Sequence, residues 1–205
     1  MQTVILGSDR FDALPLLLDR RPADTPVLYV PTAAEVLDEQ DYPTKEPRIL
    51  AAMGFPVTTA TLTGASPDQV AELLDAAGLV FVTGGSAFYL LQHALLSGFA
   101  KLVPPRVAEG SLVYVGISAG AHLATPDLLP VVSPATRPSV APDLATTTAM
   151  GLVPFSVVAH YGDPARADRH RALLESTQVR EIVPVTNEQL IVVRGTQRSV
   201  VPAVP

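Results

Sequence analysis

The chain has 205 residues, a formal net charge of −6 and no cysteine. Its apolar content of 48% is enough for one sizeable core, so we expect a single domain over residues 1–205. The acidic balance offers no basic stripe for phosphates, and the lack of cysteine excludes disulfides, thiolate zinc sites and a cysteine nucleophile. The start "MQTVILGSDR" has no basic, cleavable leader, and no apolar run approaches the roughly 18 residues of a membrane span. We therefore expect a cytoplasmic protein with no nucleic-acid or membrane partner.

Short apolar runs rich in Val, Ile and Leu are predicted as strands that are buried on both faces. They span residues 3–6, 26–31, 79–85, 111–116 and 190–193. Segments with helical spacing lie between several of them, as in "SPDQVAELLDAAG", whose Ser-Pro start supplies an N-cap and a first-turn proline. This alternation predicts an α/β fold, a three-layer sandwich with a mostly parallel central sheet.

Two further segments are predicted as irregular. Residues 38–48, "DEQDYPTKEPR", form a charge-rich run that is typical of a solvated loop and a helix start. Residues 125–143 hold many of the 20 prolines and cannot form one regular element. We expect a long surface loop there, placed as one wall of the cleft.

The sequence Gly116-Ile117-Ser118-Ala119-Gly120 fits the pattern G-x-S-x-G between a predicted strand and a helix start of small residues. This context is typical of a nucleophile elbow, in which a tight turn lifts a serine hydroxyl clear of the sheet edge and flanking glycines avoid collisions. The N–H of Ala119 would then face the negative charge of a tetrahedral intermediate. The alternative is that Ser118 only caps the following helix.

An activated serine needs a base, and the chain has four histidines. His93 and His170 lie on amphipathic helices, where a solvated or packed role is usual, and His122 should point away from the hydroxyl because it lies one helical turn further on. His160 ends the apolar run "FSVVAH" and opens the turn "YGDP", at the carboxyl end of a predicted strand. We predict that His160 is the general base; the alternative is a strand-end histidine that bonds a loop carbonyl.

A second glycine motif, "LVFVTGGSAFYLLQ", places Gly84 and Gly85 at another strand end just before a helix. Backbone amides at such a position can point at an anion and complete an oxyanion hole with Ala119. The same pair would also serve simply as a sharp turn into the helix.

Three motifs in order, "TGGSAFYLLQ", "VGISAGAHLA" and "VVAHYGDPARADRHRALLE", resemble the peptidase E (aspartyl dipeptidase) family of serine peptidases. The similarity runs from "VLYVPTAAE" to "LIVV" and implies a fold related to class I glutamine amidotransferases. It implies that Ser118 is the nucleophile and His160 the general base. It also implies that the backbone amides of Gly85 and Ala119 form the oxyanion hole.

The same resemblance implies substrate-binding residues, for which we take Gly84, Ser86 and Arg166. Arg166 matches the arginine that receives the carboxylate of an amino-terminal aspartate, a task suited to a guanidinium, although a solvated charge on a helix face is the alternative. The family usually has asparagine where this chain has Ser86, and the loop from His160 to Arg166 is several residues shorter. These departures leave the preference for aspartate open.

The third triad residue, which orients the histidine, also departs from the family pattern. The position of the family's glutamate falls on Asn187, and Glu188 follows directly. Asparagine can hold a histidine tautomer but offers no charge, and strand alternation allows only one of the two residues to face His160. We predict Asn187, with Glu188 as the alternative and Asp127 and Asp143 of the proline-rich segment as further candidates.

We therefore expect a serine peptidase that hydrolyses the amino-terminal residue from dipeptides or short peptides, with no metal and no cofactor. Patterns typical of nucleotide and zinc sites, such as Walker A, G-x-G-x-x-G and H-E-x-x-H, do not occur in the required context. Two alternatives stay open: a catalytically weak homologue that binds a small amide or amino acid, and an esterase with the same elbow. The resemblance also implies a homodimer or another small homo-oligomer.

Overall fold

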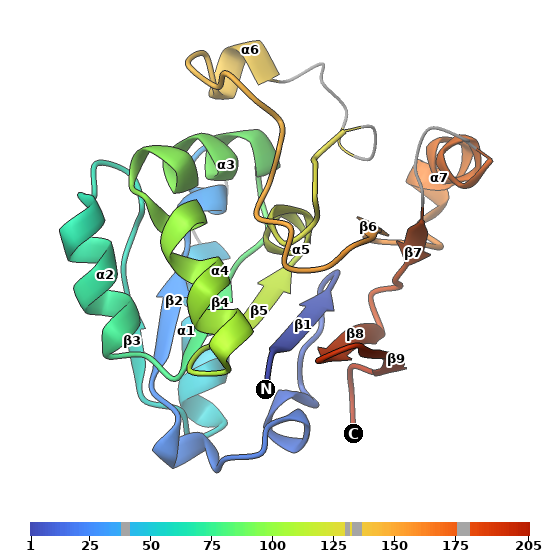
Figure 1. The fold of residues 1–205 in the computed structure, drawn as a ribbon. Coiled ribbons are helices and arrows are strands. Elements are labelled where there is room, and N and C mark those ends of the chain that lie inside the picture. The colour runs from blue at the N-terminus through green and yellow to red at the C-terminus, as the bar shows by residue number, and fades with distance from the viewer. Residues whose placement is uncertain (38–41, 130–131, 133–136, 176–180) are drawn as a thin grey trace.

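The structure is a computed structural model that describes residues 1–37, 42–129, 132, 137–175 and 181–205. The strands of its main sheet are β1 Thr3–Gly7, β2 Val27–Val30, β3 Val57–Thr59, β4 Leu79–Val82, β5 Val113–Ile117, β8 Gln189–Arg194 and β9 Gln197–Pro202. They lie in the order β3-β2-β4-β5-β1-β8-β9 (Figure 1). The first five are parallel, whereas β8 and β9 are antiparallel to their neighbours. The predicted α/β fold with a mostly parallel sheet is confirmed.

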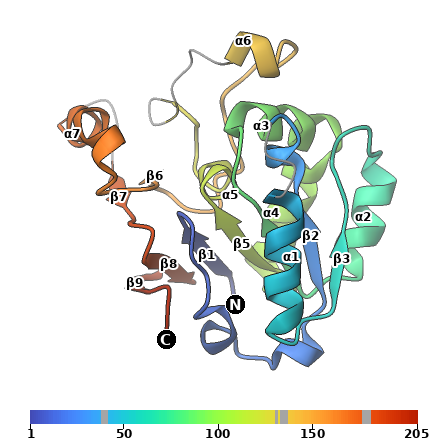
Figure 2. The ribbon, with the colours of Figure 1, turned by 180° about the vertical axis from the view of Figure 1, so that it is seen from behind.

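Helices cover both faces of this sheet (Figures 1 and 2). They are α1 Tyr42–Ala52, α2 Pro67–Asp75, α3 Ala87–Leu96, α4 Phe99–Glu109, α5 Ala119–Leu123, α6 Arg137–Val140 and α7 Ala167–Leu174, with short 3-10 turns η1 Leu14–Leu17, η2 Pro22–Asp24, η3 Thr32–Ala34 and η5 Pro164–Arg166. Successive residues of β1 alternate between two cores: Val4 and Leu6 pack in the core beneath α2 to α5, and Ile5 packs in the core with Leu50 of α1. The continuous apolar runs are therefore strands buried on both faces, as predicted.

Helix α2 begins where the sequence places its N-cap. The Ser66 hydroxyl accepts a hydrogen bond from the N–H of Gln69 at 3.3 Å, and the Gln69 side chain accepts one from the N–H of Ser66 at 2.9 Å. This reciprocal capping box satisfies two amides that the helix itself leaves unpaired, and Pro67 occupies the first turn.

The predicted charge-rich loop is only partly as expected. Residues 38–41 lie outside the described residues, and α1 already begins at Tyr42. Glu46 is not solvated: it is 6% exposed and accepts hydrogen bonds from the hydroxyls of Tyr29 and Thr83. Burial raises the pKa of this carboxyl, which the two hydroxyl donors partly offset.

The proline-rich segment is less exposed than a free surface loop. Residues 130–131 and 133–136 lie outside the described residues, but the rest includes the short helix α6 and two side chains of the core, Leu128 and Ala141. Packing of these two side chains in the core anchors a segment that is otherwise irregular.

A second, two-stranded parallel sheet is formed by β6 Ser156–Val158 and β7 Ile182–Pro184. It lies beyond the carboxyl end of β1, close to α7 (Figure 1). In the main sheet, Gly116 of β5 pairs with Leu6 of β1 and with Val82 of β4, so the carboxyl ends of the three strands meet at one edge. The segments that follow them are thereby brought together.

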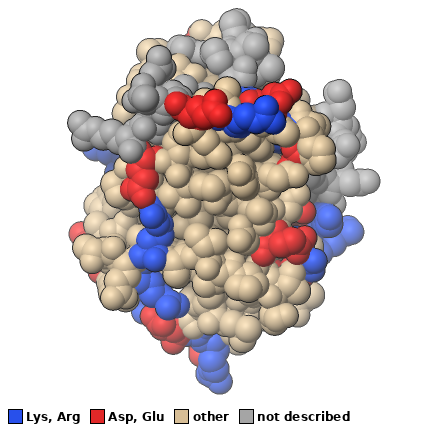
Figure 3. All heavy atoms as spheres, turned by 90° about the vertical axis from the view of Figure 1, so that its right-hand side faces the viewer, with Lys and Arg blue, Asp and Glu red and all other residues tan. Residues whose placement is uncertain are grey.

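The outermost strand on one side of the main sheet is β9, whose residues are nearly all exposed. On the side of the molecule shown in Figure 3, basic side chains lie next to acidic ones around a broad area without charged residues. Across the described ranges, no helix is both long enough and apolar enough to cross a bilayer.

The elbow requires glycine at residue 116. A Cβ atom there would overlap the carbonyl group of Gly120, because the chain turns back on itself at the start of α5. We expect Gly116→Ala to lower the free energy of unfolding in urea by about 1–3 kcal/mol. The matched control is Gly78→Ala, whose Cβ would meet only ordinary contacts from 3.5 Å outward. Equal stability losses in the two variants would contradict the steric explanation.

Candidate active site

Ser118 occupies the turn between β5 and α5. Its backbone has φ 49° and ψ −102°, and its N–H donates to the carbonyl of Gly7 at 2.8 Å. A positive φ is costly for a residue with a Cβ atom, so the elbow is strained and is held by its surroundings. The serine side chain makes no capping hydrogen bond to α5, which leaves the hydroxyl available for another partner.

That partner is His160, which follows β6. The Nε2 atom of His160 lies 3.0 Å from the Oγ atom of Ser118. Among the described residues, these two are the only non-glycine residues with a positive φ, 49° at Ser118 and 57° at His160. Strained backbone at two residues that face each other is typical of a functional site.

Asn187 completes a row of three side chains. Its Oδ1 atom lies 2.8 Å from Nδ1 of His160, so the ring can donate from Nδ1 and keep Nε2 free to accept from the serine hydroxyl. The alternative residue, Glu188, is 65% exposed in its side chain and forms an ion pair with Arg10 at 3.5 Å. The two neighbours thus have different partners, and only Asn187 contacts the imidazole.

The further acidic candidates have other contacts. The Asp127 carboxylate accepts a hydrogen bond from the N–H of Leu129 at 2.8 Å. Asp143 follows α6 and donates its backbone N–H to the side chain of Gln92 at 3.0 Å.

Ser8 supports the backbone of His160 and is not among the site residues predicted from the sequence. It is fully buried directly after β1, and its hydroxyl accepts from the N–H of His160 and donates to the carbonyl of Val185, both at 2.8 Å. The Ser8 side chain therefore links the end of β1 in the main sheet to the residues that follow β6 and β7, close to His160. The signal available in the sequence was a hydroxyl residue at the end of the apolar run "TVILGS".

The two residues predicted for the oxyanion hole, Gly85 and Ala119, differ in their surroundings. Gly85 is exposed in the same cavity as Ser118 and has φ 137°, and a Cβ there would overlap the backbone of Ala33. Ala119 is buried and is the first residue of α5, directly after the serine. Residue 85 must therefore be glycine, both because of its positive φ and because the backbone of η3 approaches it closely.

The two neighbours of Gly85 differ. Gly84 is buried and is not among the residues that line the cavity. Ser86 lines the cavity and is the N-cap of α3, where its hydroxyl oxygen accepts from the N–H of Tyr89 at 3.3 Å. The structure therefore brings Ser86, but not Gly84, to the cavity wall.

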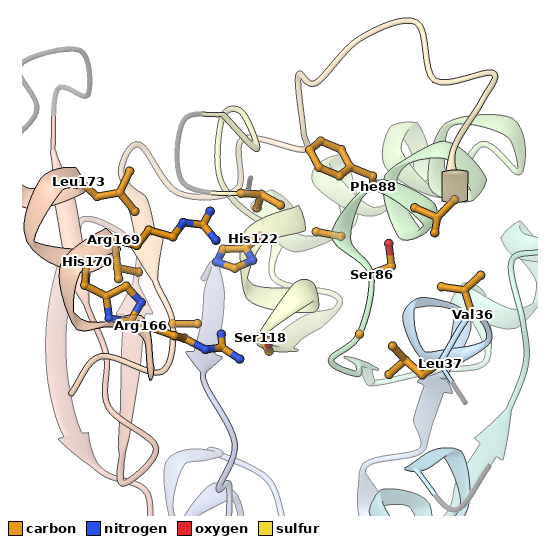
Figure 4. Close-up of a pocket in the computed structure, with 16 residues that line it drawn as sticks. Val36, Leu37, Ser86, Phe88, Ser118, His122, Arg166, Arg169, His170 and Leu173 are labelled. Atoms are coloured by element: carbon orange, nitrogen blue, oxygen red, sulfur yellow. The ribbon is translucent and has the colours of Figure 1, made fainter. Parts of the chain in front are cut away.

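The cavity in front of Ser118 has a volume of about 370 Å³. Figure 4 shows residues of α7 and the preceding turn on one side and residues of α3 and of the segment after η3 on the other. Its described lining contains no aspartate or glutamate; the lining side chains that carry or can accept a positive charge are Arg166, Arg169, His122 and His170.

Arg166 reaches this cavity from the end of η5. Its guanidinium lies 3.2 Å from the Asp163 carboxylate, and its side chain is half exposed. Arg166 was predicted from the sequence, whereas three further residues of the same wall were not: Arg169, His170 and Leu173. Their spacing of three, four and seven residues from Arg166 is that of one helix face, and this periodicity was the signal that could have found them.

His122 lies four residues after the serine on α5, and the serine hydroxyl is within hydrogen-bond distance of His160 rather than of this ring. It lines the cavity together with Ser118, and its Nε2 atom is buried without a hydrogen-bond partner. Burial, followed by the nearby His160 and the charge of Arg169, lowers the pKa of His122 to about 4. The ring is therefore neutral at pH 7.

His170 is a second buried imidazole on this wall. It is 6% exposed, stacks on Tyr161 with ring centres 6.0 Å apart, and has an Nδ1 atom without a hydrogen-bond partner. Burial, and then the charges of Arg166 and Arg169, lower the pKa of this histidine too. Despite these histidines, no group of three or more potential metal ligands occurs in the part of the chain that the structure describes.

A strained serine at a strand–helix turn, within hydrogen-bond distance of a histidine, is the arrangement of serine-type hydrolases on α/β folds. The model of Peptidase family S51 matches residues 5–201, and the chain belongs to this family of serine-type peptidases. The resemblance to the peptidase E family that the three sequence motifs indicated is thereby confirmed.

Several relatives show the same similarity. An uncharacterized peptidase of Listeria innocua, Lin0382, is 29% identical over 96% of this chain and 95% of its own length. Peptidase E of Citrobacter koseri is 29% identical over 88% of this chain and 74% of its own length. A crystal structure of a protein assigned to peptidase E, from Listeria monocytogenes, superposes with a TM-score of 0.87 at 26% identity and covers 98% of both chains.

The buried His122 predicts a specific pH dependence of stability. Because its folded pKa lies below the ordinary value of 6.5, the unfolded chain binds more protons between pH 6.5 and 4. The stabilising contribution of the neutral ring is complete above pH 6.5 and is lost as the pH falls towards 4, by about 3 kcal/mol at most. We expect His122→Leu to lose less stability than wild type over this range in urea titrations. Parallel pH profiles of the two proteins would contradict this origin.

Proposed function

We propose that the protein is a serine exopeptidase that removes the amino-terminal residue from dipeptides or short peptides. Ser118 is the nucleophile, His160 the general base and Asn187 the residue that orients the histidine. The observation that supports this assignment is the row of contacts from Ser118 Oγ to His160 Nε2 at 3.0 Å and from His160 Nδ1 to Asn187 Oδ1 at 2.8 Å.

In the first half-reaction, the hydroxyl proton of Ser118 passes to Nε2 of His160 while Oγ bonds to the carbonyl carbon of the scissile peptide. The carbonyl oxygen becomes negative and is stabilised by the backbone N–H groups of Gly85 and Ala119. His160 then gives its proton to the leaving amine as the C–N bond breaks. Water, activated by the same imidazole, hydrolyses the acyl-enzyme and restores the hydroxyl.

The amino-terminal side chain of the substrate occupies the cavity in front of Ser118, with Ser86 and Arg166 as substrate-binding residues. Both residues line this cavity, and the apolar side chains of Val36, Leu37 and Phe88 form the opposite wall. The cavity combines apolar side chains with convergent polar groups, as small-molecule sites commonly do.

Labelling with a fluorophosphonate probe and turnover of a panel of aminoacyl chromogenic amides and esters test the proposal. We expect the probe to label wild type at Ser118, and Ser118→Ala to abolish labelling and to lower amide turnover by at least about 10³-fold. The control Ser111→Ala alters an exposed hydroxyl that bonds the carbonyl of Arg106, and it should leave both readouts unchanged.

The two alternative functions give different results in the same assay. Turnover of esters without turnover of amides would replace the peptidase by an esterase. Binding of amino-acid amides without labelling or turnover would indicate the catalytically weak homologue, which Asn187 makes the stronger alternative because it offers no charge to the imidazolium.

The neutral third residue predicts a gain of activity on substitution. A carboxylate in place of the Asn187 amide would keep the acceptor for Nδ1 and stabilise the imidazolium that forms during attack. We expect Asn187→Asp to raise kcat/KM by roughly tenfold and Asn187→Ala to lower it by a similar factor. The control Glu188→Ala removes an exposed partner of Arg10 and should change little. A larger loss in Glu188→Ala than in Asn187→Ala would overturn the assignment.

A further inference from the structure

The end of β1 holds the backbones of two of the three residues to which we assign the reaction. The carbonyl of Gly7 accepts a hydrogen bond from the N–H of Ser118 at 2.8 Å. Three residues further along, the N–H of Arg10 donates to the carbonyl of Asn187 at 3.3 Å. Both bonds join main-chain atoms, so they depend on the path of the chain rather than on the side chains at residues 7 and 10.

The remaining residue, His160, is held by a side chain of the same segment. Ser8 has no exposed surface, and its hydroxyl accepts from the N–H of His160 and donates to the carbonyl of Val185, both at 2.8 Å. The hydroxyl thus uses its proton and a lone pair at the same time. The backbone position of His160 therefore depends on one buried hydroxyl group.

The two bonds of Ser8 differ in what their loss would leave behind. The carbonyl of Val185 also accepts from the N–H of Tyr161 at 3.0 Å, so it keeps a partner without Ser8. The N–H of His160 would instead lose the partner that it has in the structure. An unpaired donor is costly, so the consequence of removing the hydroxyl falls mainly on His160.

The conformation of His160 makes it sensitive to this loss. Its φ of 57° is costly for a residue with a Cβ atom, and its carbonyl accepts from the N–H of Asp163 at 3.1 Å on the far side of the residue. Without the bond to Ser8, the backbone is free to relax towards a negative φ, which turns the imidazole away from the Ser118 hydroxyl. A misplacement of about 1 Å at a reacting group can lower a rate by about a hundredfold.

We propose that Ser8 is a positioning residue of this peptidase, whose hydroxyl keeps His160 in the strained conformation in which Nε2 faces Ser118. This inference rests on the proposed function, because it takes Ser118 as the nucleophile and His160 as the base. Ser8 does not line the described part of the cavity, so it acts through His160 and not on the substrate. Its loss should therefore slow the attack by the serine and leave substrate binding unchanged.

The first test compares two buried serines. In Ser8→Ala we expect kcat for an aminoacyl chromogenic amide and the rate of fluorophosphonate labelling to fall by about tenfold to a hundredfold, with KM unchanged within about twofold. The matched control is Ser97→Ala, at the carboxyl end of α3. It also removes a fully buried hydroxyl that accepts a backbone N–H, from Phe99 at 3.4 Å. Both variants should unfold at a lower urea concentration than wild type, but only Ser8→Ala should lose kcat.

A double-variant cycle tests whether Ser8 acts through the histidine. In the His160→Ala background the imidazole is gone, so the addition of Ser8→Ala should not lower the remaining labelling rate any further. Ser8→Cys is a second, less disruptive variant, because it nearly keeps the size of the side chain but offers only a weak donor and acceptor. Its kcat should lie between those of wild type and Ser8→Ala.

The outcomes separate the two proposals. Wild-type kcat in Ser8→Ala or in Ser8→Cys, an equal loss of kcat in Ser97→Ala, or a further loss in the His160→Ala background would overturn the role of Ser8 and leave the peptidase proposal intact. Absence of labelling and turnover in a folded wild type would instead defeat the proposed function, and this role with it. Far-UV circular dichroism and the urea midpoint of each variant show that the protein measured is folded.

Discussion

The parallel pairing of β4, β5 and β1 is the constraint on which the rest of the site depends. Their register places Val82, Gly116 and Leu6 side by side, so that three chain segments leave the sheet at one edge. The elbow serine, the glycine turn before α3 and the buried Ser8 follow from these three strand ends. Without this register, residues that lie more than one hundred positions apart in the sequence would have no common edge.

Strain is concentrated where the chain leaves this edge. Ser118 and His160 both adopt a positive φ, and each is held by hydrogen bonds from β1 or the residues next to it: the carbonyl of Gly7 accepts from Ser118, and the hydroxyl of Ser8 accepts from His160. The end of one strand therefore positions both partners of the proposed proton transfer. This makes the Ser118–His160 distance a property of the packed sheets rather than of either loop.

The cavity wall formed by α7 and α5 has an unusual balance of charge. Two arginines and two imidazoles line it without an acidic side chain among the described lining residues, yet burial lowers the pKa of both histidines and keeps them neutral near pH 7. The wall thus combines the positive charge of the two arginines with two imidazoles whose neutral forms are favoured by burial.

The strands, the start of α2 and the elbow could be predicted from the sequence. Continuous apolar runs, the Ser66 cap and the G-x-S-x-G pattern each depend only on residues that are neighbours in the chain. The five predicted strands are present in the main sheet. The contact between His160 and Asn187 is a geometric observation, and the catalytic role of Asn187 stays a prediction. The roles of Ser8, His122, Glu46 and the α7 wall were decided only by the tertiary structure. Their burial and partners come from segments far away in the chain, and no local pattern carries the distance between a hydroxyl at residue 8 and an imidazole at residue 160.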